Sequence, residues 1–218
     1  MKAGSLFAGV VLAAAATAGV HAAEQGLRFE QVFRQDDGAA PLHYQARYLA
    51  GGGEHALEVW VDGGSRLKRV TDGALTIHAT RTPGDDDFRM TVLDERRRIS
   101  TRVDRGSLYR IGKFTEWFEL AQALRHPRGD YRLERTAAPD GVPAGVQPCE
   151  WYELTQSGQA SRICWSAQAR LPMLIVSQDG RVQWRVTQVD RKPVSPQQFE
   201  VRDEGFVRND ASEDMERD

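Results

Sequence analysis

The chain contains only two cysteines, Cys149 and Cys164, and their thiols are the first groups to consider for chemistry. A structural metal site needs about four ligands, and the sequence offers no third cysteine and no nearby histidine to complete one. A redox pair favours the Cys-x-x-Cys spacing, whereas fourteen residues separate these two cysteines. A disulfide is the remaining interpretation, and it depends on whether the chain reaches an oxidising compartment.

The N-terminal sequence predicts export. Lys2 precedes an uncharged apolar run from Leu6 to about Ala18, and Val20-His21-Ala22 follows, with small residues at the two positions that signal peptidase reads. The run is too short and too rich in alanine to span a bilayer core of ~30 Å. No cysteine follows it for lipid attachment. We therefore predict a signal peptide at 1–22 and a secreted, periplasmic protein that is not membrane-anchored.

An exported chain meets oxidising conditions, so we predict a structural disulfide between Cys149 and Cys164. Both cysteines lie in strand-like segments that a hairpin would join. If they face each other directly, Leu154 faces Gln159 and the turn has the sequence TQSG. The bond would then fix the register of the hairpin, and closing the loop would contribute about 3 kcal/mol to stability.

Other residue types show no pattern that is typical of catalysis or of metal binding. No two of the five histidines have zinc-ligand spacing, and there is no Gly-x-Ser-x-Gly motif. The glycines at 51–53 lack the features of a phosphate loop, and the aspartates at 85–87 lack those of a calcium loop. We therefore expect no enzymatic activity, no cofactor and no metal.

Basic residues concentrate in one segment, DERRRISTRVDR, which carries five arginines. One interpretation is a solvated strand face that resists aggregation. The other is a docking patch, with Arg97 and Arg102, for anionic lipid headgroups or an acidic partner. The net charge is −2 and falls to −3 without the signal peptide, since 1–22 contains Lys2 and no acidic residue. This balance and the predicted export argue against a nucleic-acid partner.

The elements that position these residues are mostly strands. Apolar residues alternate with polar ones through most of 27–109, beginning with Leu27, Phe29 and Phe33 in GLRFEQVF. Short Gly- and Asp-rich turns separate the runs, so neighbouring strands must pair antiparallel. A Pro- and Gly-rich loop occupies 136–148, after which the alternation resumes with CEWYEL, SRICW, PMLIVS and VQWRVTQV.

One helix is predicted within KFTEWFELAQALRHP. Its apolar residues recur at helical spacing and Pro127 ends it; they are Phe114, Trp117, Phe118, Ala121 and Leu124. We therefore expect an α+β fold, mostly β, in which a curved antiparallel sheet packs one main helix on its concave face. Residues 23–202 would form a single domain, and 203–218 an acidic, disordered tail.

Three segments resemble the periplasmic lipoprotein-carrier superfamily of LolA, LolB and RseB: HALEVWVDGGSRLKRVTDG, FRMTVLDERRRIS and CWSAQARLPMLIVSQDGRVQWRVTQV. The resemblance is one of pattern and covers most of the chain after the predicted signal peptide. It implies a half-barrel that is open on one side, is capped by a helix, and holds acyl chains in its concave face.

The leading hypothesis is therefore a non-enzymatic periplasmic carrier or sensor that binds a lipid or an acylated protein. Its hydrophobic cavity would be lined by Val59, Ile77, Met90, Val92, Trp117 and Phe118. One alternative is an RseB-like regulatory module that binds an envelope protein through the arginine-rich segment or the acidic tail. A further alternative is a structural envelope protein whose concave face is fully packed.

Overall fold

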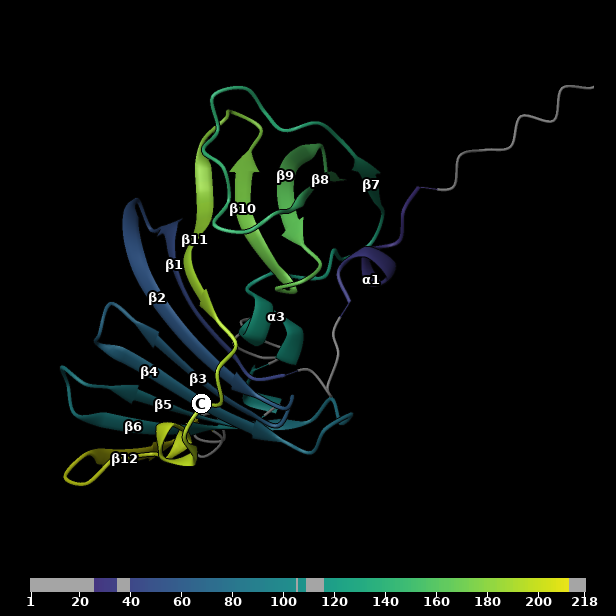
Figure 1. The fold of residues 1–218 in the computed structure, drawn as a ribbon. Coiled ribbons are helices and arrows are strands. Elements are labelled where there is room, and N and C mark those ends of the chain that lie inside the picture. The colour runs from purple at the N-terminus through teal and green to yellow at the C-terminus, as the bar shows by residue number, and fades with distance from the viewer. Residues whose placement is uncertain (1–25, 35–39, 105, 109–115, 212–218) are drawn as a thin grey trace, which may run out of the picture.

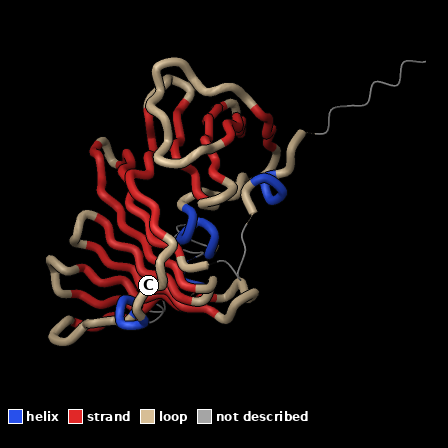
Figure 2. The backbone as a smooth tube through the Cα atoms, viewed as in Figure 1, coloured by secondary structure: helices blue, strands red, loops and turns tan. Residues whose placement is uncertain are grey.

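One open, curved sheet of twelve strands organises the molecule (Figure 1). The computed structural model describes residues 26–34, 40–104, 106–108 and 116–211, so the predicted signal peptide lies outside the described residues. Along the sheet the strands follow the order β12-β6-β5-β4-β3-β2-β1-β11-β10-β9-β8-β7. Strands are the main regular structure of the described residues and the helices are short (Figure 2). The expectation of a mostly β fold with a curved sheet is therefore confirmed.

The first half of the sheet is a meander of six antiparallel strands. These are β1 (Leu42–Ala50), β2 (Gly53–Asp62), β3 (Arg66–Thr71), β4 (Leu75–Arg81), β5 (Phe88–Asp94) and β6 (Ile99–Val103). The β1–β2 hairpin shows how a turn of two residues can join neighbouring antiparallel strands. Gly51 and Gly52 both have positive φ, at 56° and 82°, which a two-residue turn of the primed type requires.

The second half of the sheet contains the strands that follow the helical segment. They are β7 (Tyr131–Arg135), β8 (Glu150–Gln156), β9 (Gln159–Ser166), β10 (Leu171–Ser177) and β11 (Val182–Asp190). β11 pairs antiparallel with β1 and thereby joins the two halves into one sheet. β12 (Val207–Asp210) runs parallel to β6, so the sheet is mixed and not purely antiparallel as predicted.

The predicted main helix is shorter in the structure. Helix α3 (Trp117–Gln122) has six residues, and Ala123 ends it in the left-handed conformation with φ of 55°. The predicted residue Phe114 lies outside the described residues. Within the described part of the chain no helix reaches seven residues, so the expectation of one main helix is not supported. α3 does lie on the inner side of the bend of the sheet (Figure 1).

The segment GLRFEQVF was predicted to be a strand, and this prediction is wrong. It contains the short helix α1 (Phe29–Val32), and Phe33 follows as the C-cap residue. The spacing of four between Phe29 and Phe33 fits a buried face in either structure, because it matches one helical turn and two strand repeats. The tertiary contacts of the two rings, described below, decide between these two local structures.

Two clusters of buried side chains form the core. The larger lies on the inner face of the sheet, where strand residues such as Tyr44 and Val59 meet Trp117 and Leu120 of α3. The smaller gathers α1 against β7, β8 and β9. Its buried members are Phe29, Phe33, Phe118, Leu124, Leu133, Tyr152, Ile163 and Trp165. Helix α3 contributes to both clusters and so links the two halves of the molecule.

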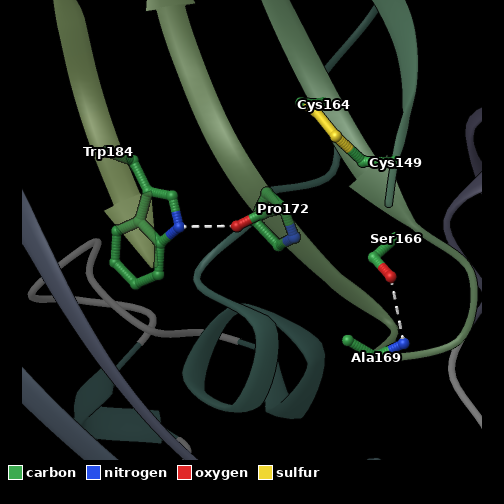
Figure 3. The surroundings of a disulfide bond; sticks show 6 residues. All are labelled: Cys149, Cys164, Ser166, Ala169, Pro172 and Trp184. Carbon is green, nitrogen blue, oxygen red and sulfur yellow. Dashed lines mark hydrogen bonds between the residues drawn. A yellow bond between two sulfur atoms is a disulfide. The ribbon is translucent and has the colours of Figure 1, made fainter. Parts of the chain in front are cut away.

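The disulfide between Cys149 and Cys164 is present, with the two Cα atoms 5.3 Å apart (Figure 3). Its predicted register is wrong. Cys164 pairs with Trp151 and not with Cys149, so the bond runs diagonally to the residue just before β8. The β8–β9 turn consists of Ser157 and Gly158, both with positive φ, instead of the four residues TQSG. A two-residue turn with positive φ at both positions matches the twist of the flanking strands, whereas a type I or type II turn would splay them.

The C-terminal segment after β11 folds over the outer face of the sheet, where the 3-10 helix η1 (Pro196–Phe199) packs on β3. The chain then reaches β6. Asp203 accepts a hydrogen bond of 3.0 Å from the Ser100 hydroxyl, and the Arg98 guanidinium lies 4.1 Å from the centre of the Phe206 ring. The predicted disordered tail therefore does not begin at 203, because these contacts and β12 hold the chain through 210.

Candidate functional site

The residues predicted to line an acyl cavity lie in the core. Val59, Ile77 and Val92 lie in one row across the inner face, because Val59 and Ile77 both pair with Arg69 of β3, and Ile77 pairs with Val92 of β5. The five residues Val59, Ile77, Met90, Trp117 and Phe118 are 0%, 4%, 6%, 4% and 2% exposed. Val92 is half-buried and packs against the larger cluster. The structure brings most of these residues together, and it packs them against other side chains.

Helix α3 covers the row through specific contacts. The buried hydroxyl of Tyr44 donates a hydrogen bond of 3.0 Å to the carbonyl of Ala121 at the end of α3. Trp117 meets Phe88 edge to face and lies under the guanidinium of Arg81, 4.6 Å from the ring centre. An aromatic pair and a cation over a ring each favour this placement. The helix therefore occupies the concave face.

An arginine interrupts the apolar row on the inner face. Arg69 pairs with Val59 on one side and with Ile77 on the other, and it is 6% exposed. Burial raises the pKa of the Tyr44 hydroxyl, and the positive charge of Arg69 acts in the opposite direction. The wall predicted to line a hydrophobic cavity therefore contains a buried cation beside a buried phenol.

The two arginines predicted to form an anionic docking patch lie apart in the fold. Arg97 is in the β5–β6 turn, with an exposed side chain 3.8 Å from the Asp94 carboxylate. Arg102 is in β6, where it pairs with Thr91 on one side and with Asp210 of β12 on the other. The docking role stays a prediction.

The described histidines do not converge on one point. His43 stacks on Trp60 with ring centres 4.9 Å apart, and His55 contacts the Asp72 carboxylate at 2.7 Å. His78 is buried beneath Phe199, and His126 lies against the Phe29 ring. Among the described residues, no group of three or more His, Cys, Asp or Glu side chains could hold a metal ion.

Strand β7 ends the sheet on one side and borders a groove with a volume of about 710 Å³. One wall is the segment 26–28 and the other is β7 with its side chains, 131–135. The Leu27 amide donates a hydrogen bond of 3.1 Å to the Leu133 carbonyl from outside the sheet. The edge of β7 therefore accepts an extended segment of chain at this point.

The pairing with β8 fixes which backbone groups of β7 face the groove. The Thr136 amide donates to the Trp151 carbonyl, so Glu134 and Arg132, which lie two and four residues before Thr136, also direct their backbone groups toward β8. The backbone groups of Leu133 point away from β8, and the hydrogen bond that the Leu133 carbonyl accepts from the Leu27 amide confirms this direction. Tyr131 and Arg135 share the phase of Leu133, so their backbone groups also point outward.

Charged side chains surround the groove. Arg132 forms an ion pair with Glu134 on the same strand, and Arg135 contacts Glu150 at 3.1 Å. Arg28 is exposed on the opposite wall. The lining residues therefore include three arginines, Arg28, Arg132 and Arg135, and one carboxylate, that of Glu134, while Glu150 lies outside the lining.

The segment beside the groove is anchored by α1. Its first amide, that of Phe29, donates a hydrogen bond of 2.9 Å to the Tyr131 hydroxyl. Phe33 lies edge to face with Trp165 and Tyr152, with ring centres 5.1 Å and 5.6 Å away. The groove wall at 26–28 is therefore held in place by the smaller core cluster.

No protein-family model and no curated protein matches the chain. Among solved structures, MucB aligns at a TM-score of 0.43 and 12% identity over 81% of this chain and 62% of that chain. MucB in complex with MucA(peri) aligns at a TM-score of 0.40 and 12% identity, over 78% of this chain and 56% of that chain. PNGF-II aligns at a TM-score of 0.31 and 8% identity, over 82% of this chain and 33% of that chain. This chain covers less than two thirds of the length of MucB, and these comparisons do not place it in a family.

Sequence reasoning did not find the groove. Tyr131–Arg135 alternates like any other short strand, and its position at the end of the sheet depends on the strand order. The wall at 26–28 lies more than 100 residues away in the sequence. The only available signal was the exposed charge on both segments, which is typical of an edge strand.

Proposed function

We propose that this chain is a non-enzymatic, periplasmic binding module that recognises an extended segment of a partner protein at the edge of β7. The observation that carries the proposal is the groove beside edge strand β7, whose backbone groups at Tyr131 and Arg135 point away from β8, while the Leu133 carbonyl is already bonded to the Leu27 amide. Addition of a strand to such an edge is a recurrent mode of peptide recognition, since main-chain hydrogen bonds supply affinity.

The charge of the groove indicates the kind of segment that it binds. Arg28, Arg132 and Arg135 give the lining an excess of positive charge, although Glu134 and Glu150 neutralise part of it. A peptide with acidic side chains would gain attraction mainly at the wall that carries Arg28, because Arg132 and Arg135 already pair with Glu134 and Glu150, and the attraction would weaken with salt. The proposed partner segment is therefore extended and acidic.

Substitution of Arg135 tests the backbone contact. Arg135→Pro removes the outward N–H and leaves the β8 ladder intact, because proline is tolerated where an edge N–H faces outward. Arg135→Ala is the matched control, since it removes the same charge and keeps the N–H. Acidic peptides would first be selected from a displayed random library on the mature wild-type protein.

We expect selected peptides to bind the Arg135→Pro variant about tenfold more weakly than Arg135→Ala, because one hydrogen bond is lost. Hydrogen exchange at the Leu133 and Arg135 amides should slow on binding. If the two variants bind alike and neither amide gains protection, the proposed edge is not the binding site.

Acyl-chain binding in the concave face is the second candidate. The burial of Val59, Ile77 and Trp117 in one apolar cluster favours it, because displacement of α3 would expose a hydrophobic face. Each buried methylene of a lipid would contribute about 0.8 kcal/mol, which must offset the loss of the α3 contacts. Native mass spectrometry of the protein purified from cells would detect bound lipid, and a lipid-free spectrum would argue against this candidate.

Within the described residues, no helix combines the length and the hydrophobicity that a membrane crossing requires.

A further inference from the structure

The segment 26–28 occupies part of the β7 edge that a partner strand would use. Its Leu27 amide donates a hydrogen bond of 3.1 Å to the Leu133 carbonyl, which points away from β8. Phe29 lies two residues further along the chain, and its amide bonds to the Tyr131 hydroxyl at 2.9 Å. The segment therefore runs antiparallel to β7 and is placed like a strand added to a sheet edge.

The backbone of this segment is extended where it approaches α1. Arg28 has φ of −89° and ψ of 136°, which lie in the β region. A Cβ atom added to Gly26 would lie 3.7 Å from the Leu133 carbonyl oxygen, an ordinary van der Waals distance, so Gly26 also lies against β7. Gly26 and Leu27 thus cover the centre of the edge.

The contact of these two residues with β7 is limited. Within the described residues, one backbone hydrogen bond joins the segment to β7. Leu27 is 37% exposed, whereas Phe29, two residues later, is fully buried. A single hydrogen bond at an exposed edge has a small net effect on stability, because water replaces it when it breaks. Gly26 and Leu27 can therefore leave the edge at a small cost in free energy.

The residues after Leu27 are held by several contacts. The Arg28 carbonyl accepts hydrogen bonds from the amides of Gln31 and Val32, at 3.1 Å and 3.2 Å. The Phe29 and Phe33 rings meet edge to face with centres 4.7 Å apart, and α1 lies beside β7 (Figure 1). Movement at the junction of Leu27 and Arg28 would leave α1 in place. Arg28 would also stay on the groove wall, where it can attract an acidic partner.

A partner strand cannot pair along the whole of β7 while Leu27 stays. Such a strand uses the outward backbone groups of Tyr131, Leu133 and Arg135 in succession. The Leu133 carbonyl is in the middle of this row, and Leu27 fills the space beside it. The partner and the N-terminal segment therefore compete for the same acceptor and the same space.

We propose that Gly26 and Leu27 form an autoinhibitory segment, which a partner must displace from the β7 edge before it binds. This inference rests on the proposed function and concerns the regulation of the same site. Only the molecules from which the segment has left the edge can pair with a partner, so the segment lowers the apparent affinity. If one hydrogen bond holds it, this fraction is about a tenth to a third, and its release raises affinity about threefold to tenfold.

Substitution of Leu27 tests the inference on the full mature protein. Leu27→Pro removes the N–H that bonds to the Leu133 carbonyl. Leu27→Ala is the matched control, because it removes the same side chain and keeps the N–H. The probe is an acidic peptide selected from the displayed random library on the wild-type protein. Its affinity for the wild type and for both variants is measured by calorimetry.

Hydrogen exchange followed by NMR gives an independent readout that needs no variant. The Leu27 amide of the wild-type protein should exchange faster when the peptide binds, because it loses its acceptor. The Tyr131 and Arg135 amides should exchange more slowly, because the peptide covers them. Opposite changes on the two sides of one edge are specific to displacement, since a peptide that binds elsewhere would produce neither.

We expect Leu27→Pro to bind the peptide about threefold to tenfold more tightly than Leu27→Ala. If the peptide protects the Tyr131 and Arg135 amides, while the two variants bind alike and the Leu27 amide keeps its protection, the autoinhibitory role is refuted and the proposed function stands. If no selected peptide protects those two amides, the proposed function fails, and the autoinhibitory role fails with it.

Discussion

Phe33 anchors the N-terminal segment, so its truncation should destabilise the protein strongly. The ring is 1% exposed and contacts Phe29, Tyr152 and Trp165, with ring centres 4.7–5.6 Å away. Phe→Ala substitutions at buried sites cost about 3–5 kcal/mol, which includes the cavity that is left. A helix of four residues has no stability of its own, so α1 cannot compensate for the lost contacts.

For a chain of this length, 1 kcal/mol shifts the midpoint of thermal unfolding by about 2–4 °C. Phe33→Ala should therefore lower the midpoint by about 6–20 °C. The assay is urea and thermal unfolding of the mature protein, followed by tryptophan fluorescence. Leu49→Ala is the control, because Leu49 is 42% exposed at a hairpin end and should cost under about 0.5 kcal/mol.

A loss below about 1 kcal/mol for Phe33→Ala would refute this reasoning, since a fully buried ring cannot be removed so cheaply. The N-terminal segment would then not be packed on β8 and β9. The wall of the β7 groove would lose its anchor as well, so the same measurement bears on the proposed binding site.

Three further predictions concern stability. Replacing Cys149 and Cys164 by serine should cost about 3 kcal/mol, because the bond closes a loop with a sequence separation of 15; equal urea midpoints for this variant and the oxidised wild type would contradict this. Tyr44→Phe should cost about 1–3 kcal/mol, because the buried Ala121 carbonyl loses its donor, and an unchanged midpoint would show that α3 is held otherwise. His78 has its pKa lowered from 6.5 to about 4 in the folded chain, so the unfolded chain binds the extra proton between these values. Stability should therefore fall as the pH drops from 6.5 toward 4, and it should fall less in His78→Gln; parallel pH curves would exclude this role for His78.

The β8–β9 hairpin shows how far sequence patterns reach. Export and cysteine count predicted the disulfide between Cys149 and Cys164, which the structure contains. The register was missed by two residues, because it was inferred from direct opposition of the cysteines. A disulfide also tolerates a diagonal pair, and the two-residue turn at Ser157 and Gly158 decides the register.

The helices show a different limit. Alternation and helical spacing overlap at intervals of four residues, so the pattern of Phe29 and Phe33 could not distinguish a strand from α1. For α3, a stripe of apolar residues extends through Leu124, yet the helix ends at Gln122. Leu124 is still buried, because the chain beyond the helix turns into the smaller cluster. Burial of an apolar residue therefore does not define the local structure around it.

By itself, the sequence determined that the chain is mostly β, which strands pair through short turns, and that the two cysteines form a bond. These properties follow from local periodicity and from turn residues that are neighbours in the chain. Only the tertiary structure decided that β7 lies at an edge, that α3 fills the concave face, and that 195–202 covers His78. Each depends on contacts between residues far apart in the sequence, and these contacts form only when the whole sheet has assembled.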